Sequence, residues 1–319
     1  MHAIRLHEFG PPENLRYEQV EDPRPGPGQA RIAVAAAGVH LIDTVIRSGR
    51  QMGPMPLPEL PAIPGREVAG VVDALGDGVS EDWMGRRVVA HLGPASGGYA
   101  EFAVCDAAAL HALPAGLADE AAVAMIGTGR TALAILEVAR IAPDDVVLVT
   151  AAAGGLGTLL VQASRAAGAT VIGAAGGPEK VARVRELGVT AVDYNEPGWG
   201  EAVHGATVAL DGVGGALGRE ALERLEPGGR LIVYGLASGA PTQLSVGDLL
   251  SRGLTVSAAI GPHIQRRPGG MRGLEADALA AAAEGRLTPL VTRFGLAQAA
   301  DAHAAIEARA TVGKTVLAP

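Results

Sequence analysis

The segment from Val149 to Gly177 holds the residues whose types and spacing most clearly predict chemistry. It reads VTAAAGGLGTLLVQASRAAGATVIGAAGG: an apolar run, a glycine-rich turn, a helix-like stretch and a second apolar run. Ala152, Gly154 and Gly157 fall on the three positions of the G-x-G-x-x-G pattern, with alanine as the smallest replacement for the first glycine. Backbone amides at the start of the following helix would face phosphate groups. The turn therefore predicts a dinucleotide site, and the alternative is a packing turn in another α/β protein.

The end of the second apolar run indicates which dinucleotide is bound. Sites that prefer NAD place an Asp or Glu about 20 residues after the turn, where it binds the ribose 2′-hydroxyl. Here residues 174–177 read AAGG, without a carboxylate that would repel a 2′-phosphate. Lys180 and Arg183 follow on one helix face and could hold that phosphate, or could be ordinary solvated charges. The segment predicts NADPH as the cofactor.

Composition excludes several classes of protein. The chain has 319 residues, a formal net charge of -8, and 48% hydrophobic but only 3% aromatic residues. This acidic balance argues against a nucleic-acid partner, which would need a basic stripe. The single cysteine, Cys105, excludes an internal disulfide framework and favours the cytoplasm, and its apolar surroundings predict a buried, inert thiol. The opening MHAIRLHEFG lacks a long apolar region, so neither a targeting segment nor a membrane anchor is expected.

The order of apolar patterns predicts two kinds of domain. Up to about residue 120, short strand patterns alternate with Pro- and Gly-rich turns, as in an all-β barrel or sandwich. Residues 121–140 read as a helix interrupted at GTGRT. From Pro143 onwards strands alternate with helices, as in a parallel sheet buried on both faces. Two Ala-rich helices and a last strand, KTVLAP, end the chain, and this strand is expected to pair with the first domain.

Several separate motifs resemble one known family. IPGREVAGVV, GGYAEFA, AAAGGLGTLLVQ, LDGVGG and GKTVL occur in the order seen in medium-chain dehydrogenases and reductases. GVHLIDTVIRSG is similar to the segment found in the zinc-free NADPH:quinone oxidoreductase branch, which includes zeta-crystallin. The resemblance covers nearly the whole chain.

The family fold that this resemblance implies is α/β, in three segments. A GroES-like β-domain would cover residues 1–122, a Rossmann domain with a doubly wound parallel sheet residues 123–260, and a return to the first domain residues 261–319. The resemblance also implies ligands in an interdomain cleft. It further implies a homodimer formed through the edge of the Rossmann sheet, near LTVSAAI.

The resemblance implies a set of cofactor-binding residues as well. They lie at the glycine turn, at strand ends that line the dinucleotide and near the C-terminus, and comprise Thr131, Gly154, Gly155, Leu156, Gly157, Gly176, Lys180, Tyr194, Gly212, Tyr234, Leu236 and Arg309. Within this set, Lys180 matches a lysine that binds the 2′-phosphate and Tyr194 matches a tyrosine beside it. Arg309 matches an arginine that reaches the cofactor.

A metal site is not expected. The positions of the catalytic zinc ligands in the related alcohol dehydrogenases fall on His40, Arg66 and Gly127. Only His40 could bind a metal, whereas a catalytic zinc takes three protein ligands. The lobe that would carry a structural zinc has no cysteines to offer.

Chemistry without a metal favours conjugated acceptors. Hydride transfer to a quinone, or to the β-carbon of an enone, spreads charge over several atoms, so a few hydrogen-bond donors can suffice. His40 is the candidate catalytic proton donor because its reference pKa lies near neutrality. Its alternative role is a packing residue that hydrogen-bonds the cofactor ribose or a backbone carbonyl. Asp43 could orient His40 or an arginine, or make a structural hydrogen bond. Arg66 could bind an anionic substrate group, or pair with Glu67 or another acid.

The predicted function is a zinc-independent, NADPH-dependent oxidoreductase that acts on quinones. Departures from the family pattern leave the substrate open. Quinone reductases usually have asparagine where this chain has His40, and often tyrosines where Val45 and Gln51 stand, so the pocket is expected to be less aromatic. The nearest alternative is an enoyl or alkenal reductase. A third, from another class, is a nucleotide-binding protein with a structural or regulatory role.

Overall fold

The computed structural model describes residues 1–319 except 52–55, 94–95, 262–263 and 265. The chain divides into two compact units, Met1–Thr128 with Glu275–Pro319, and Gly129–Leu274. The boundaries expected from the sequence, after residues 122 and 260, come earlier than these. Residues 261–274 join the second unit because Ile264 and Leu274 pack with Ala134 in one apolar cluster.

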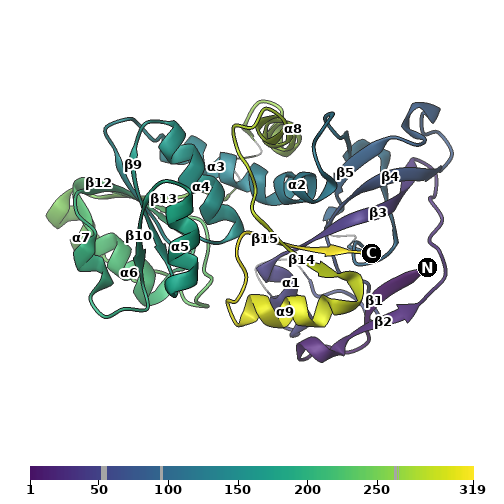
Figure 1. Ribbon diagram of the computed structural model, residues 1–319, viewed down its shortest axis with the longest axis horizontal. Coiled ribbons are helices and arrows are strands. Elements are labelled where there is room, and N and C mark those ends of the chain that lie inside the picture. The colour runs from purple at the N-terminus through teal and green to yellow at the C-terminus, as the bar shows by residue number, and fades with distance from the viewer. Residues whose placement is uncertain (52–55, 94–95, 262–263, 265) are drawn as a thin grey trace. The chain divides into compact units, whose positions relative to one another are not determined.

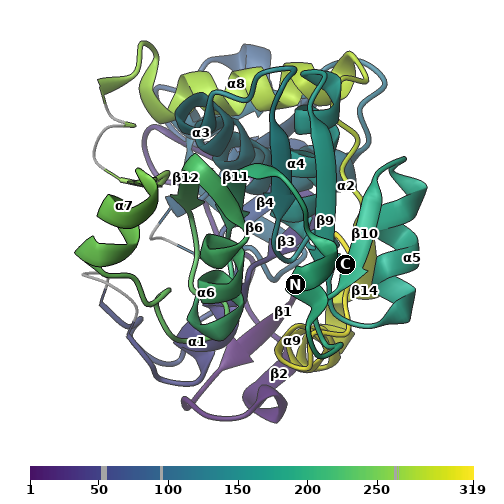
Figure 2. The same cartoon turned by 90° about the vertical axis from the view of Figure 1, so that its left-hand side faces the viewer.

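The second unit is built on one sheet of six parallel strands, in which every neighbouring pair runs in the same direction. The strands are β8 (Val146–Val149), β9 (Thr170–Ala175), β10 (Thr190–Asp193), β11 (Ala206–Asp211), β12 (Leu225–Val233) and β13 (Thr255–Ala258). Their order is β10-β9-β8-β11-β12-β13, and Figure 2 shows it from β12 through β11 and β9 to β10. The chain thus runs outward from β8 to one edge and then resumes at β11, which is the Rossmann order. The predicted doubly wound sheet is confirmed.

Helices cover both faces of this sheet. Figure 1 shows α3, α4 and α5 on one side of the strands and α6 and α7 on the other. Their bounds are α3 (Arg130–Ala139), α4 (Gly155–Ala166), α5 (Pro178–Glu186), α6 (Gly215–Glu223) and α7 (Val246–Arg252). Strand β9 shows how the two faces differ, because Ile172 packs with Leu222 of α6 whereas Gly173 faces α5. A Cβ on Gly173 would lie 2.5 Å from Cγ1 of Val184, so the bare backbone lets α5 approach closely.

The first unit contains a seven-stranded sheet and a separate pair of strands. The strands are β1 (His2–Leu6), β2 (Leu15–Gln19), β3 (Gln29–Val39), β4 (Glu67–Leu75), β5 (Arg87–His91), β6 (Phe102–Asp106), β7 (Leu110–Ala112), β14 (Val291–Gly295) and β15 (Lys314–Ala318). The main path of the sheet is β14-β15-β3-β4-β5-β7, with β6 paired to β3, while β1 pairs with β2. Strand β15 runs antiparallel to β3, with Val316 opposite Gly38. The expected pairing of the last strand with the first domain is confirmed.

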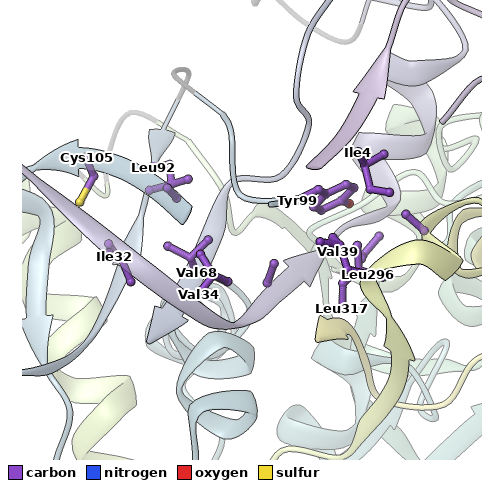
Figure 3. Close-up of a cluster of buried hydrophobic side chains, with 14 of the residues drawn as sticks. Ile4, Ile32, Val34, Val39, Val68, Leu92, Tyr99, Cys105, Leu296 and Leu317 are labelled. Atoms are coloured by element: carbon purple, nitrogen blue, oxygen red, sulfur yellow. The ribbon is translucent and has the colours of Figure 1, made fainter. Parts of the chain in front are cut away.

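The core of this unit joins the two ends of the chain. Leu296 and Leu317, from the C-terminal part, lie close to Val39 and Tyr99 in the cluster of Figure 3. Cys105 belongs to the same cluster and is 6% exposed, and burial raises the pKa of its thiol to about 12. The predicted buried, inert thiol is confirmed.

Helix α1 (Leu41–Arg47) corrects the all-β expectation for the first 120 residues. The helix expected from residue 121 begins as α2 (Asp119–Ala124), and the two expected Ala-rich helices are α8 (Gly270–Ala283), which crosses the unit boundary, and α9 (Ala299–Glu307). Helix α1 begins where the Asp43 carboxylate accepts the backbone N–H of His40 at 2.8 Å. Such a cap stabilises a short helix that apolar periodicity does not reveal.

The predicted interruption at GTGRT is confirmed, since a π-helical turn, Met125–Gly129, joins α2 to α3. The combined helical run Asp119–Ala139 is long and apolar enough to cross a membrane by length and composition alone. Most of its apolar window is buried within the protein, as in the core helices of many folded proteins.

A buried polar group ties α9 to this core. His303 is fully buried, and its Nε2 lies 3.1 Å from the Tyr99 hydroxyl, which also lies 3.3 Å from the Asp43 carboxylate. Burial lowers the pKa of His303 to about 4. The Asp43 carboxylate opposes this shift, and the Arg47 guanidinium adds to it. His303 is therefore neutral in the folded protein at neutral pH.

We expect His303 to weaken the fold at acidic pH. The pKa of His303 falls from 6.5 in the unfolded chain to about 4 in the folded protein. Above pH 6.5 the imidazole is neutral in both states and does not affect the free energy of unfolding. As pH falls from 6.5 toward 4, the unfolded state binds the proton more readily, so the free energy of unfolding decreases. The loss amounts to on the order of 3 kcal/mol. In His303→Gln, the stability measured by denaturant unfolding should fall less steeply over this range. The exposed His204 supplies the control, His204→Gln, which should keep the wild-type slope. Equal slopes in all three proteins would contradict a neutral His303.

Candidate functional site

The glycine turn adopts the backbone that its sequence predicts. Gly154 precedes the first residue of α4, and a Cβ added to it would meet only the Ala151 carbonyl, at 3.3 Å. A Cβ on Gly157 would lie 2.7 Å from Cα of Ala152, so this glycine permits close packing of helix and turn. The left-handed residue of the turn is Ala151, with φ of 48°. The turn therefore leaves the N-terminal amides of α4 open toward a phosphate.

Two tyrosine rings pack on bare glycine backbone beyond the neighbouring strands. The position of a Cβ on Gly176, after β9, lies 2.7 Å from the ring of Tyr194. The corresponding position on Gly212, after β11, lies 2.4 Å from the ring of Tyr234. The Tyr234 hydroxyl donates to the Thr150 carbonyl at 3.5 Å, so these predicted residues gather beside the glycine turn. This edge is the switch point of the sheet, where such folds bind dinucleotides.

Leu236, Thr131, Gly155, Leu156 and Arg309, which were also predicted to bind the cofactor, lie in four places. Leu236 is 41% exposed, and its Cδ2 lies 3.4 Å from the Cβ position of Gly214, after β11. Thr131 is half-buried in the first turn of α3. Gly155 and Leu156 open α4. Arg309 is exposed directly after α9 and belongs to the first unit.

A carboxylate that the sequence argument missed lies at the loop before α5. Asp193 ends β10, and its Oδ1 accepts the backbone N–H of Gly177 at 2.9 Å. Lys180 stands in the first turn of α5, while Arg183 pairs with Glu186 at 3.0 Å on an exposed face. The signal for Asp193 was the parallel register, which sets it opposite Ala175. This loop thus combines Lys180 with Asp193, whose carboxylate already accepts hydrogen bonds from backbone amides.

In the first unit, His40 belongs to a compact cluster of charged side chains. Its Nε2 lies 2.8 Å from Oε2 of Glu67 and 2.9 Å from Nζ of Lys314. Lys314 Nζ also lies 2.9 Å from the same Glu67 oxygen. The side chains of Glu67 and Lys314 are 0% and 5% exposed, and that of His40 is 24% exposed. The three residues come from the N-terminus of α1 and the first positions of β4 and β15.

Missing side chains make room for the Glu67 carboxylate. A Cβ on Gly127, in the π-helical turn, would overlap Oε1, and one on Gly38 would lie 2.3 Å from Oε2. Burial alone would raise the pKa of Glu67, but the His40 imidazole and the Lys314 ammonium together lower it below its ordinary value. Glu67 is therefore ionised, and the cluster compensates its buried charge.

Asp43 acts on the backbone of His40 and on an arginine. Its Oδ2 accepts the His40 backbone N–H at 2.8 Å, and its Oδ1 lies 3.4 Å from Nε of Arg66. Burial raises the pKa of Tyr99 well above its usual range, and the adjacent Asp43 raises it further. Of the open possibilities, the structure thus shows Arg66 paired with Asp43, and Glu67 is the acid that contacts the imidazole.

The residues at the expected zinc positions do not form a zinc site. His40 meets Glu67, Gly127 has no side chain, and Arg66 pairs with Asp43. A zinc site of this type needs three protein donors, and the Lys314 ammonium occupies the place beside both His40 and Glu67. Among the residues that the structure describes, no group of three His, Cys, Asp or Glu side chains could hold a metal ion.

Glu67 and Lys314 are the functional candidates that sequence reasoning did not assign. Both stand in motifs that carried the resemblance, PGRE and GKTVL, directly before apolar strand residues. A charged residue at the start of a buried strand was the available signal. Its partner could not be identified from spacing, since His40 and Lys314 are 274 positions apart.

Two family models match the chain. One, described as "Alcohol dehydrogenase GroES-like domain", matches residues 26–115, and the other, described as "Zinc-binding dehydrogenase", matches residues 155–275. The first match lies within the unit that holds the His40 cluster. The second covers most of the unit with the parallel sheet.

Full-length relatives are similar to this chain. A "Quinone oxidoreductase" from Pseudomonas aeruginosa is 32% identical over 326 residues, covering 99% of both chains. A "2-haloacrylate reductase" from a Burkholderia species is 33% identical over 330 residues, covering 99% of this chain and 98% of that protein.

Solved structures of similar sequence share the whole fold. An Escherichia coli quinone oxidoreductase complexed with NADPH has a TM-score of 0.87 at 29% identity, covering 100% of both chains. A mycobacterial protein complexed with NADPH has a TM-score of 0.87 at 33% identity, also over 100% of both chains. With relatives above 30% identity over its full length, the chain belongs to the medium-chain dehydrogenase/reductase family, among its quinone oxidoreductases, and is an oxidoreductase.

Proposed function

We propose that this protein is an NADPH-dependent oxidoreductase that reduces quinones without zinc. The observation that carries the proposal is the cluster of His40, Glu67 and Lys314, which stands where a metal-dependent relative would need further donors. When bound, NADPH supplies the hydride. The protein contributes a polar group at the acceptor oxygen, and for a conjugated acceptor such a group is sufficient.

Binding of NADPH is supported by the form of the second unit. The turn at Gly154 and Gly157 opens the N-terminus of α4 toward a pyrophosphate, at the switch point of the sheet. Lys180 is the residue proposed to bind the 2′-phosphate. Asp193 does not prevent this, because its Oδ1 already accepts the backbone N–H groups of Gly177 and Asn195, both at 2.9 Å.

His40 is the residue proposed to contact the acceptor oxygen. Its ring is anchored through Nε2 by Glu67 and Lys314, and a quarter of the side chain is exposed. The backbone N–H of Asp43 meets the His40 side chain in the cap of α1, so the ring is held in one orientation. A partly exposed ring held in this way can be approached by a substrate oxygen.

A second candidate is the reduction of activated carbon–carbon double bonds. The specific observation in its favour is the 33% identity to a protein named "2-haloacrylate reductase". Purified protein should oxidise NADPH on addition of a small quinone, and product analysis with an α,β-unsaturated ketone and with 2-chloroacrylate separates the two activities. Turnover should survive dialysis against a chelator. If the purified protein contains stoichiometric zinc and loses turnover when the zinc is removed, the proposal of zinc-independent reduction is wrong.

The cofactor preference should depend on Lys180. We expect Lys180→Ala to raise the Kd for NADPH roughly tenfold to a hundredfold, the usual range for one charge-assisted contact, and to leave the Kd for NADH nearly unchanged. Arg183→Ala removes the same charge from the same helix and should change neither value much. Equal losses for both cofactors in Lys180→Ala would refute the assignment.

Turnover should depend on His40. We expect His40→Ala to lower kcat about a hundredfold through loss of a donor at the reacting oxygen, while the Kd for NADPH stays within about twofold. His204→Gln is the matched control and should retain wild-type turnover. A weaker NADPH affinity with unchanged kcat would instead assign His40 to the cofactor ribose.

We also propose that the chain forms a homodimer through the edge of the parallel sheet. β13 is the last strand of that sheet, and the preceding α7 exposes Val246 and Leu250 by 69% and 79%. Exposed apolar side chains of this size mark contact surfaces. Leu250→Glu should shift sedimentation from dimer to monomer, and Met84→Glu, in the other unit, should not. A wild-type monomer would contradict the proposal.

A further inference from the structure

The carboxylate of Asp211 ends β11, in the LDGVGG motif, and is fully buried. Its Oδ1 accepts the backbone N–H groups of Val213 at 2.9 Å and Gly214 at 3.2 Å. Oδ1 also accepts the Thr150 hydroxyl at 2.9 Å, and Oδ2 accepts the Thr242 hydroxyl at 2.7 Å. Four donors from three segments of the chain therefore meet at one carboxylate.

This carboxylate takes the place that a phosphate would take in the other half of the sheet. In both halves a strand is followed by a glycine-containing turn and a helix, β8 by α4 and β11 by α6. The amides at the start of α4 are open toward a phosphate, whereas those of Val213 and Gly214, directly before α6, donate to Asp211. The pyrophosphate is therefore expected at α4, and the loop after β11 is left for an uncharged part of the ligand.

The loop after β11 is hydrogen-bonded to the loop after β12. The N–H of Ser238 donates to the Val213 carbonyl at 2.8 Å, and the N–H of Gly215 donates to the Ala240 carbonyl at 3.0 Å. A Cβ on Gly214 would lie 2.3 Å from the carbonyl oxygen of Ala240, so this approach requires bare backbone. The two loops therefore form one paired structure at the carboxyl edge of the sheet.

Thr242 links the second of these loops to the buried carboxylate. Residues 236–241 are exposed, and Thr242 is the partly buried residue that follows them. Its hydroxyl reaches Asp211 because Gly218 of α6 has no side chain. A Cβ on Gly218 would lie 2.2 Å from Oγ1 of Thr242 and 2.3 Å from Oδ2 of Asp211. One hydroxyl thus connects an exposed loop to the interior of the unit.

The paired loops lie on the side of the sheet where the nicotinamide half of NADPH is expected. A doubly wound sheet is built from two mononucleotide-binding halves, and a dinucleotide binds across the switch point between them. Lys180 stands in the helix after β9, and Tyr194 directly follows β10, so these two residues mark the half of the adenosine 2′-phosphate. The nicotinamide half is then the one at β11 and β12, where the paired loops begin.

We propose that Asp211 and Thr242 are positioning residues that hold the paired loops, residues 212–215 and 236–240, in the arrangement that receives the nicotinamide ring. This inference rests on the proposed binding of NADPH at this edge and specifies the residues that shape it. Both side chains act through the backbone of the loops. A loop that is already held in its binding arrangement loses less entropy when the ligand arrives, so the ligand binds more tightly.

The test compares NADPH with adenosine 2′,5′-bisphosphate, which carries the adenine and the 2′-phosphate but no nicotinamide. We expect Thr242→Val to raise the Kd for NADPH roughly tenfold, because the link is lost while the size of the side chain is kept. The Kd for the bisphosphate should stay within about twofold. Thr242→Ser keeps the hydroxyl and should bind both ligands as the wild type does. Thr190→Val makes the same change at an exposed position of β10 and should change neither Kd.

A double-variant cycle tests whether Thr242 acts through Asp211. Asp211→Ala removes every contact of the carboxylate and should raise the Kd for NADPH at least as much as Thr242→Val does. Adding Thr242→Val to Asp211→Ala should raise it no further, because the partner of the hydroxyl is already absent. Independent, multiplying losses would overturn the link between the two residues. Thr242→Val lies close to the surface and keeps the inference falsifiable if Asp211→Ala does not fold.

The outcomes separate this inference from the proposed function. Equal losses of affinity for NADPH and for the bisphosphate in Thr242→Val would assign the contact to the folding of the whole unit and overturn its role at the nicotinamide. An unchanged Kd for NADPH in this variant would overturn it as well. If the two Kd values separate as expected but the wild type reduces no quinone, the proposed function fails while the roles of Asp211 and Thr242 stand.

Discussion

The buried carboxylate of Glu67 is the constraint on which the first unit depends. A charge with no exposure is tolerated only if opposite charge compensates it, and Nζ of Lys314 and Nε2 of His40 lie 2.9 and 2.8 Å from Oε2 of Glu67. Meeting this requirement brings together the start of β4, the start of β15 and the N-terminus of α1. It also excludes any side chain at Gly38 and Gly127, whose Cβ atoms would overlap the carboxylate. One charge therefore specifies the path of the last strand and the position of the candidate catalytic ring.

In the second unit the recurring constraint is close backbone approach. With 45 glycines and only 3% aromatic residues, the chain fills its interior with small and branched side chains. Gly157 and Gly173 let α4 and α5 approach the turn and sheet, while Gly176 and Gly212 accept tyrosine rings. The two tyrosines thus act as large, rigid fillers at the carboxyl edge of a sheet whose own residues are small. A dinucleotide site built this way depends more on absent side chains than on present ones.

Local patterns allowed most of the fold to be predicted. The fully apolar run at β8, the glycine turn and the caps at Pro178 and Gly188 depend on neighbours in sequence, so the parallel unit could be inferred element by element. Helix α1 was missed because a single cap, Asp43 on the His40 amide, stabilises it against a background of strand patterns.

Long-range contacts could not be predicted from local sequence patterns. The acid that contacts the His40 imidazole is Glu67, and the one at the cofactor loop is Asp193 from the next parallel strand. Residue type and spacing could nominate His40, Asp43 and Lys180 as chemical groups. The partner that each of these side chains contacts depends on strand register between segments that are tens to hundreds of residues apart. Local sequence patterns do not reveal this register.

The Lys314 ammonium also bears on which substrates the proposed chemistry suits. A metal ion with an open coordination position can bind a substrate oxygen directly, and so stabilise a localised alkoxide. The side chain of Lys314 is 5% exposed and contacts both Glu67 and His40, so it is not open to bind a substrate oxygen directly. A hydrogen bond from a side chain stabilises a localised oxyanion less than a metal ion does, and is better matched to charge that is already delocalised. The construction of the cluster therefore favours quinones and activated alkenes over simple carbonyls.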